Sequence, residues 1–483
     1  MREQQKENGT YQKKASVSNA QSNFKTQEEE QEGREEAVDA RFQAFRTMLP
    51  ILLKQLSKFK DPRQAHKIKH KLAVIVLFGL LCFVFQMSSR RQANAQMSRP
   101  CFFETLQSLF PELETMPHAD TLNRLLEKLD IDALPTAHIA LIKRFISSKK
   151  FVKYLIQKCY PIAIDGTQKL VRDGEWQAFE WLTRSGNAEG ETWEQQYVYV
   201  LEANLVFHNG MTLPLFSEFL SQAEGDSDST KQDCELKAFK RLTAKIKQQF
   251  PHLPTMILLD GLYPNGPVFE ICAQNGWDSM IVLQKKSLKN TWKKFAAMKK
   301  PDDPVYERNW RGRRQKITWV NDIPYSYTDA DGVKKTLSIH MVICDEEWEV
   351  VSDKAAEIET KYSRHAWISG KPLNAQNVHE RCNLGARFRW GIEDSNNTEK
   401  RRGYCYEHAF SYNWQAMCGF HHLMRMAHLI NAITLATQRV AKLVLKMGIR
   451  EFFTFVKETL TGPWISKDWA AKFLMQSFEV LIE

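Results

Sequence analysis

The sequence predicts an α/β protein with a mixed β-sheet in its middle and helical regions at both ends. Between residues 156 and 300, short apolar runs of strand length alternate with amphipathic segments of helical period. This alternation is typical of a mixed sheet flanked by helices. The segments 41–155 and 376–483 keep the helical period almost throughout.

Length and charge narrow the class of protein further. With 483 residues the chain exceeds what one hydrophobic core organises, which predicts two to four domains. The formal net charge is +10, and residues 1–40 hold six basic and nine acidic residues, so the rest carries +13. A positive body suggests a polyanionic partner, with nucleic acid favoured over a membrane. The alternative is that the charge serves solubility alone.

Cysteine usage and hydropathy exclude other classes. The nine cysteines are scattered and never form a C-x2-C pair, so neither a zinc site nor a disulfide framework is predicted, and a reducing cytosol fits. The longest apolar run, Leu72–Phe85, has fourteen residues and is too short to span a bilayer. We therefore expect no membrane partner.

The first 155 residues divide into two regions. Residues 1–40 are polar and contain few apolar side chains, which predicts a disordered tail. Residues 41–155 read as an all-helical domain, in which Lys67, Lys69 and Lys71 precede the apolar helix at Leu72. Basic residues directly before the start of a helix favour a DNA-binding domain. The alternative is a helical packing or dimerisation domain.

The first part of the catalytic core is predicted over residues 156–300. A buried strand at 161–164 runs into Asp165, and a second strand at 255–259 runs into Asp260. An aspartate followed by glycine is either a turn former or a ligand, and sites in open α/β sheets lie at the carboxyl ends of strands. Two such aspartates on separate strands favour the ligand interpretation. The remaining elements expected here are a hairpin at 197–219, helices at 232–250, 266–274 and 288–298, and a strand at 280–283.

A β-rich insertion is predicted over residues 301–375, where short alternating segments recur. It interleaves basic and aromatic side chains, a pattern that suits contacts to the DNA backbone together with base stacking. The alternative is that the tryptophans belong to the core of the sheet. The candidate DNA-binding residues of this region are Trp310, Arg311, Arg313, Arg314 and Trp319.

Residues 376–435 are expected to add a helix that completes the catalytic core, followed by a helical C-terminal region at 436–483. Glu393 lies four residues after Arg389 and seven before Lys400, so the three share one face of a helix. Arg401 and Arg402 extend the basic cluster. An acid flanked by cations suits a metal-bound phosphodiester, although solvated helices also alternate charge.

Two histidines of the last long helix, His421 and His428, also share a face. Neither a cysteine nor an acid completes a zinc set with them in the sequence. We expect them to have a core or surface role.

Together the segments Asp165-Gly-Thr, Asp260-Gly-Leu-Tyr and Arg389-x3-Glu393-x6-Lys400 resemble the DDE transposases of bacterial insertion sequences. The similarity is to the branch with a Y-x2-R-x3-E-x6-K signature and a β insertion before the glutamate. It covers roughly residues 156–430. The spacing of arginine, glutamate and lysine matches in full, whereas the position of the signature tyrosine is occupied by Ala386.

This resemblance implies a ribonuclease H-like core that binds the ends of an insertion sequence, cuts DNA there and joins it to target DNA. Two Mg²⁺ ions, with Mn²⁺ as an alternative, would stabilise the attacking and leaving oxygens. Asp165 would bridge both ions, with Asp260 and Glu393 completing one each. Arg389 and Lys400 would hold phosphates, the arginine as a bidentate fork and the lysine as a point charge.

The partners implied are DNA, as terminal inverted repeats and target DNA, and a second copy of the chain, because two ends must be paired. The location implied is the bacterial cytoplasm, at the nucleoid. Two alternatives remain from the sequence: a catalytically inactive, transposase-derived DNA-binding protein, and a ribonuclease H-like nuclease without strand transfer. The intact set of three acids argues against the first.

Overall fold

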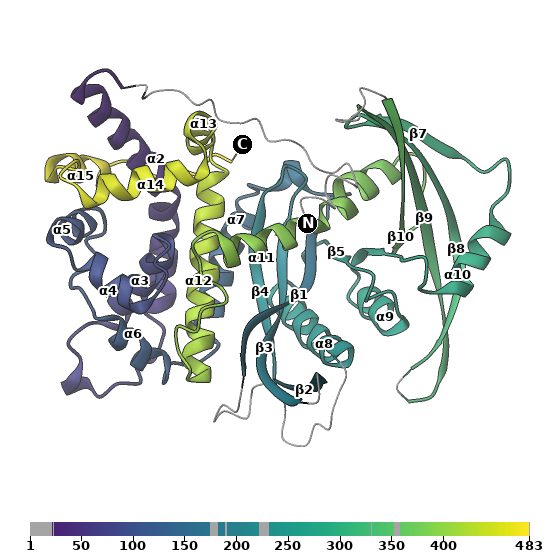
Figure 1. Ribbon diagram of the computed structural model, residues 1–483, viewed down its shortest axis with the longest axis horizontal. Helices are drawn as coiled ribbons and strands as arrows, with labels where there is room; N and C mark the ends of the chain where they lie inside the picture. The colour runs from purple at the N-terminus through teal and green to yellow at the C-terminus, as the bar shows by residue number, and fades with distance from the viewer. Residues whose placement is uncertain are drawn as a thin grey trace.

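The computed structural model describes residues 22, 24–173, 182–188, 191–221, 231–329, 331–351 and 358–482. A bundle of helices occupies one end of the molecule, and one large sheet with its own helices occupies the rest (Figure 1). The predicted α/β class with a mixed sheet is confirmed.

The sheet has ten strands in the order β2-β3-β1-β5-β6-β10-β9-β8-β7, and β4 pairs with β3. The neighbours β1, β5 and β6 run parallel, whereas the pairs on either side of them are antiparallel. The strands are β1 Tyr160–Asp173, β2 Leu182–Ala188, β3 Glu191–Val206, β4 Thr212–Leu220, β5 Thr255–Leu259, β6 Asp278–Val282, β7 Val305–Trp310, β8 Arg313–Thr328, β9 Lys334–Val351 and β10 Ile358–Ser369.

Side chains of β1 and β5 alternate between two cores, as the two-residue period of a strand requires. Ile162 and Ile257 belong to the larger core, together with Phe239 of helix α8 (Lys231–Gln249). Ala163 and Leu258 belong to a second core on the opposite face, which contains Ile392 of helix α11 (Gly391–Arg401). The two faces of the central sheet are therefore covered by different helices.

The predicted end of the first strand is wrong. β1 does not turn at Asp165-Gly166-Thr167 but continues to Asp173. The cause is the antiparallel pairing with β3, which extends from Ile162 opposite Leu205 to Asp173 opposite Gln195. β5 has no such partner beyond Leu259 and ends directly before Asp260, as predicted.

The β-rich segment predicted at 301–375 does not form a separate body. Its last strand, β10, pairs with β6 of the central sheet, with Trp367 opposite Val282. β9, β8 and β7 follow outward, so the segment extends the same sheet. Helices α9 (Gly266–Gln274) and α10 (Lys289–Met298) each contact β8.

The helical end of the molecule combines the two chain termini. Helix α3 is buried along nearly its whole length and contacts α12, while α14 packs on α2 and α15 on α5. The predicted regions 41–155 and 436–483 therefore pack together in one helical unit. Its helices are α2 Gln27–Leu56, α3 Leu72–Val84, α4 Arg90–Met97, α5 Pro100–Leu109, α6 Ala119–Leu126, α7 Ala133–Ser147, α13 Gln438–Met447, α14 Ile449–Thr461 and α15 Lys467–Leu474.

The predicted disordered tail over residues 1–40 is wrong in its last part, because α2 begins at Gln27. The Thr26 side chain accepts a hydrogen bond from the Glu29 backbone and caps the helix, and acidic residues fill its first turn. Arg34 is buried, with its guanidinium over the rings of Phe455 and Trp464. Packing against the C-terminal helices thus compensates for the low apolar content. Residues 1–21 and 23 lie outside the described part of the chain.

Helix α12 (Trp414–Leu435) lies between most of the helical unit and the sheet, and α7 contacts β4 beside it (Figure 1). Its Met417 and Cys418 pack on Val198 and Val200 of β3, and the helix also contacts α3. Among the described helices, each one is too short or too polar to cross a membrane.

The helix predicted from Arg389 through Lys400 is present but is not uniform. Residues Glu380–Gly385 are π-helical, Ala386–Trp390 form a 3-10 turn, and only then does α11 begin at Gly391. The buried Arg381 anchors this segment to the sheet, with its Nη2 2.6 Å from Oδ1 of Asp278 on β6. Ala386, at the position of the signature tyrosine, is buried in the second core.

Candidate active site

Of the three predicted acids, one lies on β1 and another directly follows β5, the parallel neighbour of β1. Ala163 of β1 pairs with Leu258 of β5, and the same offset places Asp165 beside Asp260. Asp165 follows Ala163 by two residues on β1, so it projects from the face that carries the second core, and Asp260 comes directly after the last residue of β5. The sheet therefore brings together two carboxylates that are 95 residues apart in the sequence.

Helix α11 supplies the third acid on that face. Ile392 is buried in the second core, which fixes α11 against the sheet. Its neighbour Glu393 accepts a hydrogen bond of 2.8 Å from Nη2 of Arg389, which lies in the 3-10 turn. The predicted proximity of Arg389 and Glu393 is thus present, although the two belong to different kinds of helical turn.

The electrostatics of these acids indicate that they share one site. Burial raises the pKa of Asp165 to about 7; the Arg389 guanidinium opposes this rise, and the charges of Glu393 and Asp260 add to it. Burial also raises the pKa of Glu393, again opposed by Arg389 and assisted by Asp260. Each carboxylate therefore lies within electrostatic range of another, and ionising them together is unfavourable without further cations.

A fourth acid, Glu235 of α8, was not predicted from the sequence. It is buried, and its charge contributes to the raised pKa of Asp165. Burial raises the pKa of the Tyr199 hydroxyl, and a hydrogen bond to Glu235 raises it further. The signal was the helical period itself: Glu235 lies three and four residues before Ala238 and Phe239, on the apolar side of α8.

Gly166 allows this second layer to approach the site. A Cβ at Gly166 would lie 2.6 Å from the Tyr199 hydroxyl, closer than real contacts allow. The absence of a side chain therefore lets the phenol lie against the backbone directly after Asp165. Tyr263, of the Asp260-Gly-Leu-Tyr segment, is also buried, and burial together with the charge of Glu235 raises its pKa.

The side chains as placed do not form a closed metal cage. Within the described ranges, no three carboxylate, imidazole or thiolate groups lie close enough together to hold a metal ion. The donors that do gather are carboxylate oxygens, which Mg²⁺ prefers. Mg²⁺ commonly binds one or two carboxylates, with the remaining ligands from waters and substrate phosphates. Two of these acids would therefore be enough protein ligands for one Mg²⁺ ion.

The predicted phosphate-binding cluster has unequal exposure. Arg389 is buried, and its Nε and Nη1 have no hydrogen-bond partner among the described residues. Lys400 is mostly covered and lies 3.2 Å from Glu407. Arg401 and Arg402 are exposed at the end of α11. Arg389 therefore faces the acids, whereas the charged groups of Arg401 and Arg402 lie in solvent.

The predicted basic and aromatic residues of the β-rich segment separate into two groups. Arg311, at the β7–β8 turn, lies over the ring of Trp310 at 4.6 Å and over that of Phe388 at 5.3 Å. Because Phe388 directly precedes Arg389, this cluster borders the candidate site. Arg314 is exposed, with a weak contact of 3.9 Å to Glu307.

The other two lie in the interior of the sheet. Arg313 is buried in an ion pair with Glu346, at 2.8 Å. Trp319 is 8% exposed and packs in the second core, so in this fold it offers no face to a base. The physical reason is the strand period: Ile317 and Trp319 both point to the covered side of β8.

The histidines of α12 are buried, within the core or surface role expected of them. His421 lies 2.9 Å from the Ser217 hydroxyl, and burial lowers its pKa well below the usual range. His428 lies 2.6 Å from Glu399. Both therefore belong to a buried polar network behind α11.

Comparison with known proteins gives one domain match. Residues 53–142 match the family model described as DDE_Tnp_1-associated. The matched segment lies in the helical region and does not reach the three acids. No curated protein matches the chain.

Among solved structures, the chain is similar to the cryo-EM structure of a piggyBac transposase synaptic complex with hairpin DNA. The TM-score is 0.34 and the identity 10%, over 88% of this chain and 80% of that chain. A likeness of this degree carries no argument about fold or function.

Proposed function

We propose that the chain is a DNA transposase of the DDE type, which binds the ends of an insertion sequence and cuts and joins DNA. Its active site would be formed by Asp165, Asp260 and Glu393. The observation that carries the proposal is the gathering of these acids about one sheet face beneath one helix, where burial raises the pKa of Asp165 and of Glu393 and the neighbouring carboxylates add to the rise. The match of residues 53–142 to a model of a DDE-transposase-associated domain supports a transposase.

A ribonuclease H-like core is part of the proposal. Its support is the arrangement around β1, in which an antiparallel neighbour lies on one side and the parallel strands β5 and β6 lie on the other. Helix α8 covers one face and α11 the other. The acids come from β1, from the end of β5 and from α11.

Two Mg²⁺ ions, or Mn²⁺, are the proposed cofactors. Asp165 and Asp260 would hold one ion and Asp165 and Glu393 the other. When bound, the ions activate the attacking water or 3′-hydroxyl and neutralise the leaving oxygen. They would also favour the charged form of Asp165 and Glu393, whose pKa values are raised by burial and, to a smaller extent, by the neighbouring carboxylates.

The remaining side chains would position DNA. The two N–H groups of Arg389 that lack partners can donate to one phosphate as a fork. Lys400, Arg401 and Arg402 would neutralise the backbone beyond it, and the exposed Arg311 beside Trp310 would do so on the other side. A homodimer would bring two DNA ends together.

The test uses the purified chain and the DNA that flanks its own gene. With Mg²⁺, we expect cleavage at the element ends and joining of the freed 3′ ends to a target plasmid. With EDTA, we expect binding without cleavage. Cleavage without joining would instead support a nuclease, and binding without either reaction would support an inactive DNA-binding protein.

A further inference from the structure

Behind the candidate site, one arginine connects the sheet to the helix that carries Glu393. Arg425 of α12 is 2% exposed. Its Nη1 donates to Oε1 of Glu399 at 3.0 Å, and its Nη2 donates to Oδ1 of Asn204 at 2.5 Å. The same Nη2 lies 3.2 Å from Oε2 of Glu202. One guanidinium therefore joins α11, α12 and β3.

Both carboxylates of this network are close to a proposed catalytic acid: Glu399 along the chain, and Glu202 across the sheet. Glu399 follows Glu393 by six residues on α11. Glu202 of β3 is the residue directly opposite Asp165 of β1, so the two point to the same face of the sheet. The bridge from Glu202 to Glu399 thus connects α11 to the strand that pairs with β1 at Asp165.

The other contacts hold both carboxylates in place. Ser217 and Tyr406 donate hydrogen bonds to the two oxygens of Glu202, at 2.5 and 3.0 Å. His428 lies 2.6 Å from the Oε1 atom of Glu399. Each acid is thereby oriented by at least two groups besides its own backbone.

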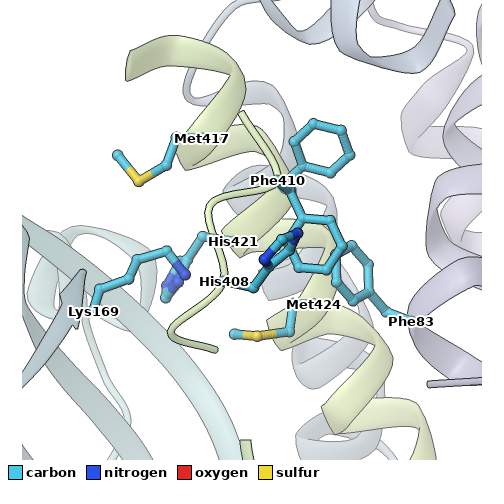
Figure 2. Close-up of a pocket in the computed structure, with 8 residues that line it drawn as sticks. Phe83, Lys169, His408, Phe410, Met417, His421 and Met424 are labelled. Atoms are coloured by element: carbon cyan, nitrogen blue, oxygen red, sulfur yellow. The ribbon is translucent and has the colours of Figure 1, made fainter. Parts of the chain in front are cut away.

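The network is not a binding pocket. The cavity beside it is lined by Lys169, His408, His421 and apolar side chains, with Lys169 and His421 lying near each other on one side (Figure 2). Its volume of about 10 Å³ is the space of one water molecule at most. A buried ion cluster is weak evidence for stability, because desolvation offsets the attraction between the charges. We therefore assign these contacts a role in fixing the relative positions of α11, α12 and β3.

We propose that Arg425 is a positioning residue for the DNA-cutting reaction: by bridging Glu202 and Glu399 it holds Glu393 at the distance from Asp165 that the metal ions require. This rests on the proposed function. Arg425 touches neither DNA nor the ions; it acts through the placement of α11.

The test compares the wild-type chain with Arg425→Lys and Glu399→Gln. The lysine keeps the charge but cannot span both acids, and the glutamine keeps the shape but removes one charge of the pair. We expect DNA binding within about threefold of wild type, a fall in cleavage of at least tenfold and a half-saturating Mg²⁺ concentration raised at least fivefold. Mn²⁺ binding to the protein–DNA complex, measured by electron paramagnetic resonance, should weaken in parallel.

Arg41→Lys is the matched control, because Arg41 is also a buried arginine but lies in the helical unit, where it donates to the Val84 carbonyl. It should lower the melting temperature without changing Mg²⁺ dependence or Mn²⁺ affinity. Wild-type metal dependence and Mn²⁺ affinity in whichever of Arg425→Lys and Glu399→Gln is folded would overturn the inference. A wild-type chain without metal-dependent cleavage would overturn the proposed function itself.

Discussion

Nη2 of Arg389 lies 2.8 Å from Oε1 of Glu393, while the other two nitrogens of the same buried guanidinium have no hydrogen-bond partner among the described residues. Buried donors without partners are costly, so a group that accepts from them is favoured there. This arrangement couples the proposed catalytic glutamate to the place where a phosphate would lie.

Replacing Arg389 by lysine should therefore reduce catalysis more than binding. Lysine keeps the charge but loses the fork that can donate to Glu393 and to a phosphate together. We expect a fall in single-turnover cleavage of roughly 10²-fold, the size seen when one preorganised donor is lost. Arg401→Lys, at an exposed position, is the control. Cleavage by Arg389→Lys within twofold of wild type would contradict the assignment.

The raised pKa of Asp165 makes a prediction about stability without metal. Its pKa is about 7 in the folded chain, against an ordinary value of 3.8, so ionisation destabilises the fold increasingly as pH rises between these values. Asp165→Asn should stabilise the metal-free chain by roughly 1–3 kcal/mol at pH 8, and by less at pH 5. Urea unfolding in EDTA at both pH values measures this. If Asp165→Asn stabilised the chain no more at pH 8 than at pH 5, or destabilised it at pH 8, the charge of Asp165 would not be destabilising the fold.

The sequence predicted much of this core because the relevant signals are local. Thr255–Leu259 and Gly266–Gln274 have the predicted bounds, since a fully apolar run and a proline near the helix start are readable without tertiary context. The end of β1 could not be predicted, because only the pairing with β3 carries that strand past Asp165. The start of α2 was missed for the same kind of reason: its stability comes from contacts with α14, far along the chain.

Protonation of His138 should destabilise the helical unit in acid. Burial lowers the pKa of this side chain to about 4, opposed by a hydrogen bond to the Pro214 carbonyl. The unfolded chain, with the ordinary value of 6.5, binds the proton first, so stability is lost as pH falls from about 6.5 toward 4. His138→Gln cannot charge but can still donate to Pro214. Between pH 7.5 and 5 the free energy of unfolding should fall by roughly 1–3 kcal/mol less in His138→Gln than in wild type. If the two curves of unfolding free energy against pH ran parallel, protonation of His138 would not cause the loss of stability in acid.

Breaking the Arg381–Asp278 pair should destabilise the segment that leads into α11. Both side chains are buried, so Arg381→Met leaves the charge of Asp278 without its partner. We expect a loss of about 3–5 kcal/mol in urea unfolding. The double variant Arg381→Met with Asp278→Leu should recover much of that loss, because an apolar pair replaces the ions without an unpaired charge. No recovery would mean that the pair contributes more than mutual neutralisation.

The exposed arginines at the end of α11 should control the salt dependence of DNA binding. Each phosphate contact that is lost lowers the slope of log K against log salt by about 0.9. Arg401→Ala with Arg402→Ala should weaken binding and reduce that slope by about 2, measured by anisotropy between 50 and 200 mM salt. Arg439→Ala, whose arginine pairs with Asp39 in the helical unit, should change neither. An unchanged slope in the double variant would place the DNA elsewhere.

The site itself was predicted only in part. Asp165, Asp260 and Glu393 could be named because each carries a local signal and a spacing within the resemblance. Glu235 was missed, because its helical spacing indicates burial only, and its link to the site comes through Tyr199 and the strand to which Tyr199 belongs. Trp319 was assigned to DNA although it lies in the core; the side of β8 that it faces is covered by the segment Glu380–Gly385, which packs there only in the folded chain.

Cleavage of the DNA that flanks the chain's own gene by the three single variants Asp165→Ala, Asp260→Ala and Glu393→Ala, over a Mg²⁺ titration, tests the central claim most directly. Each variant should bind that DNA with nearly wild-type affinity and cleave at least 10³-fold more slowly at every Mg²⁺ concentration, because each removes a ligand from an ion needed at the reacting phosphate. Full activity of any one of them, and of Glu393→Ala above all, would contradict the proposed three-acid site.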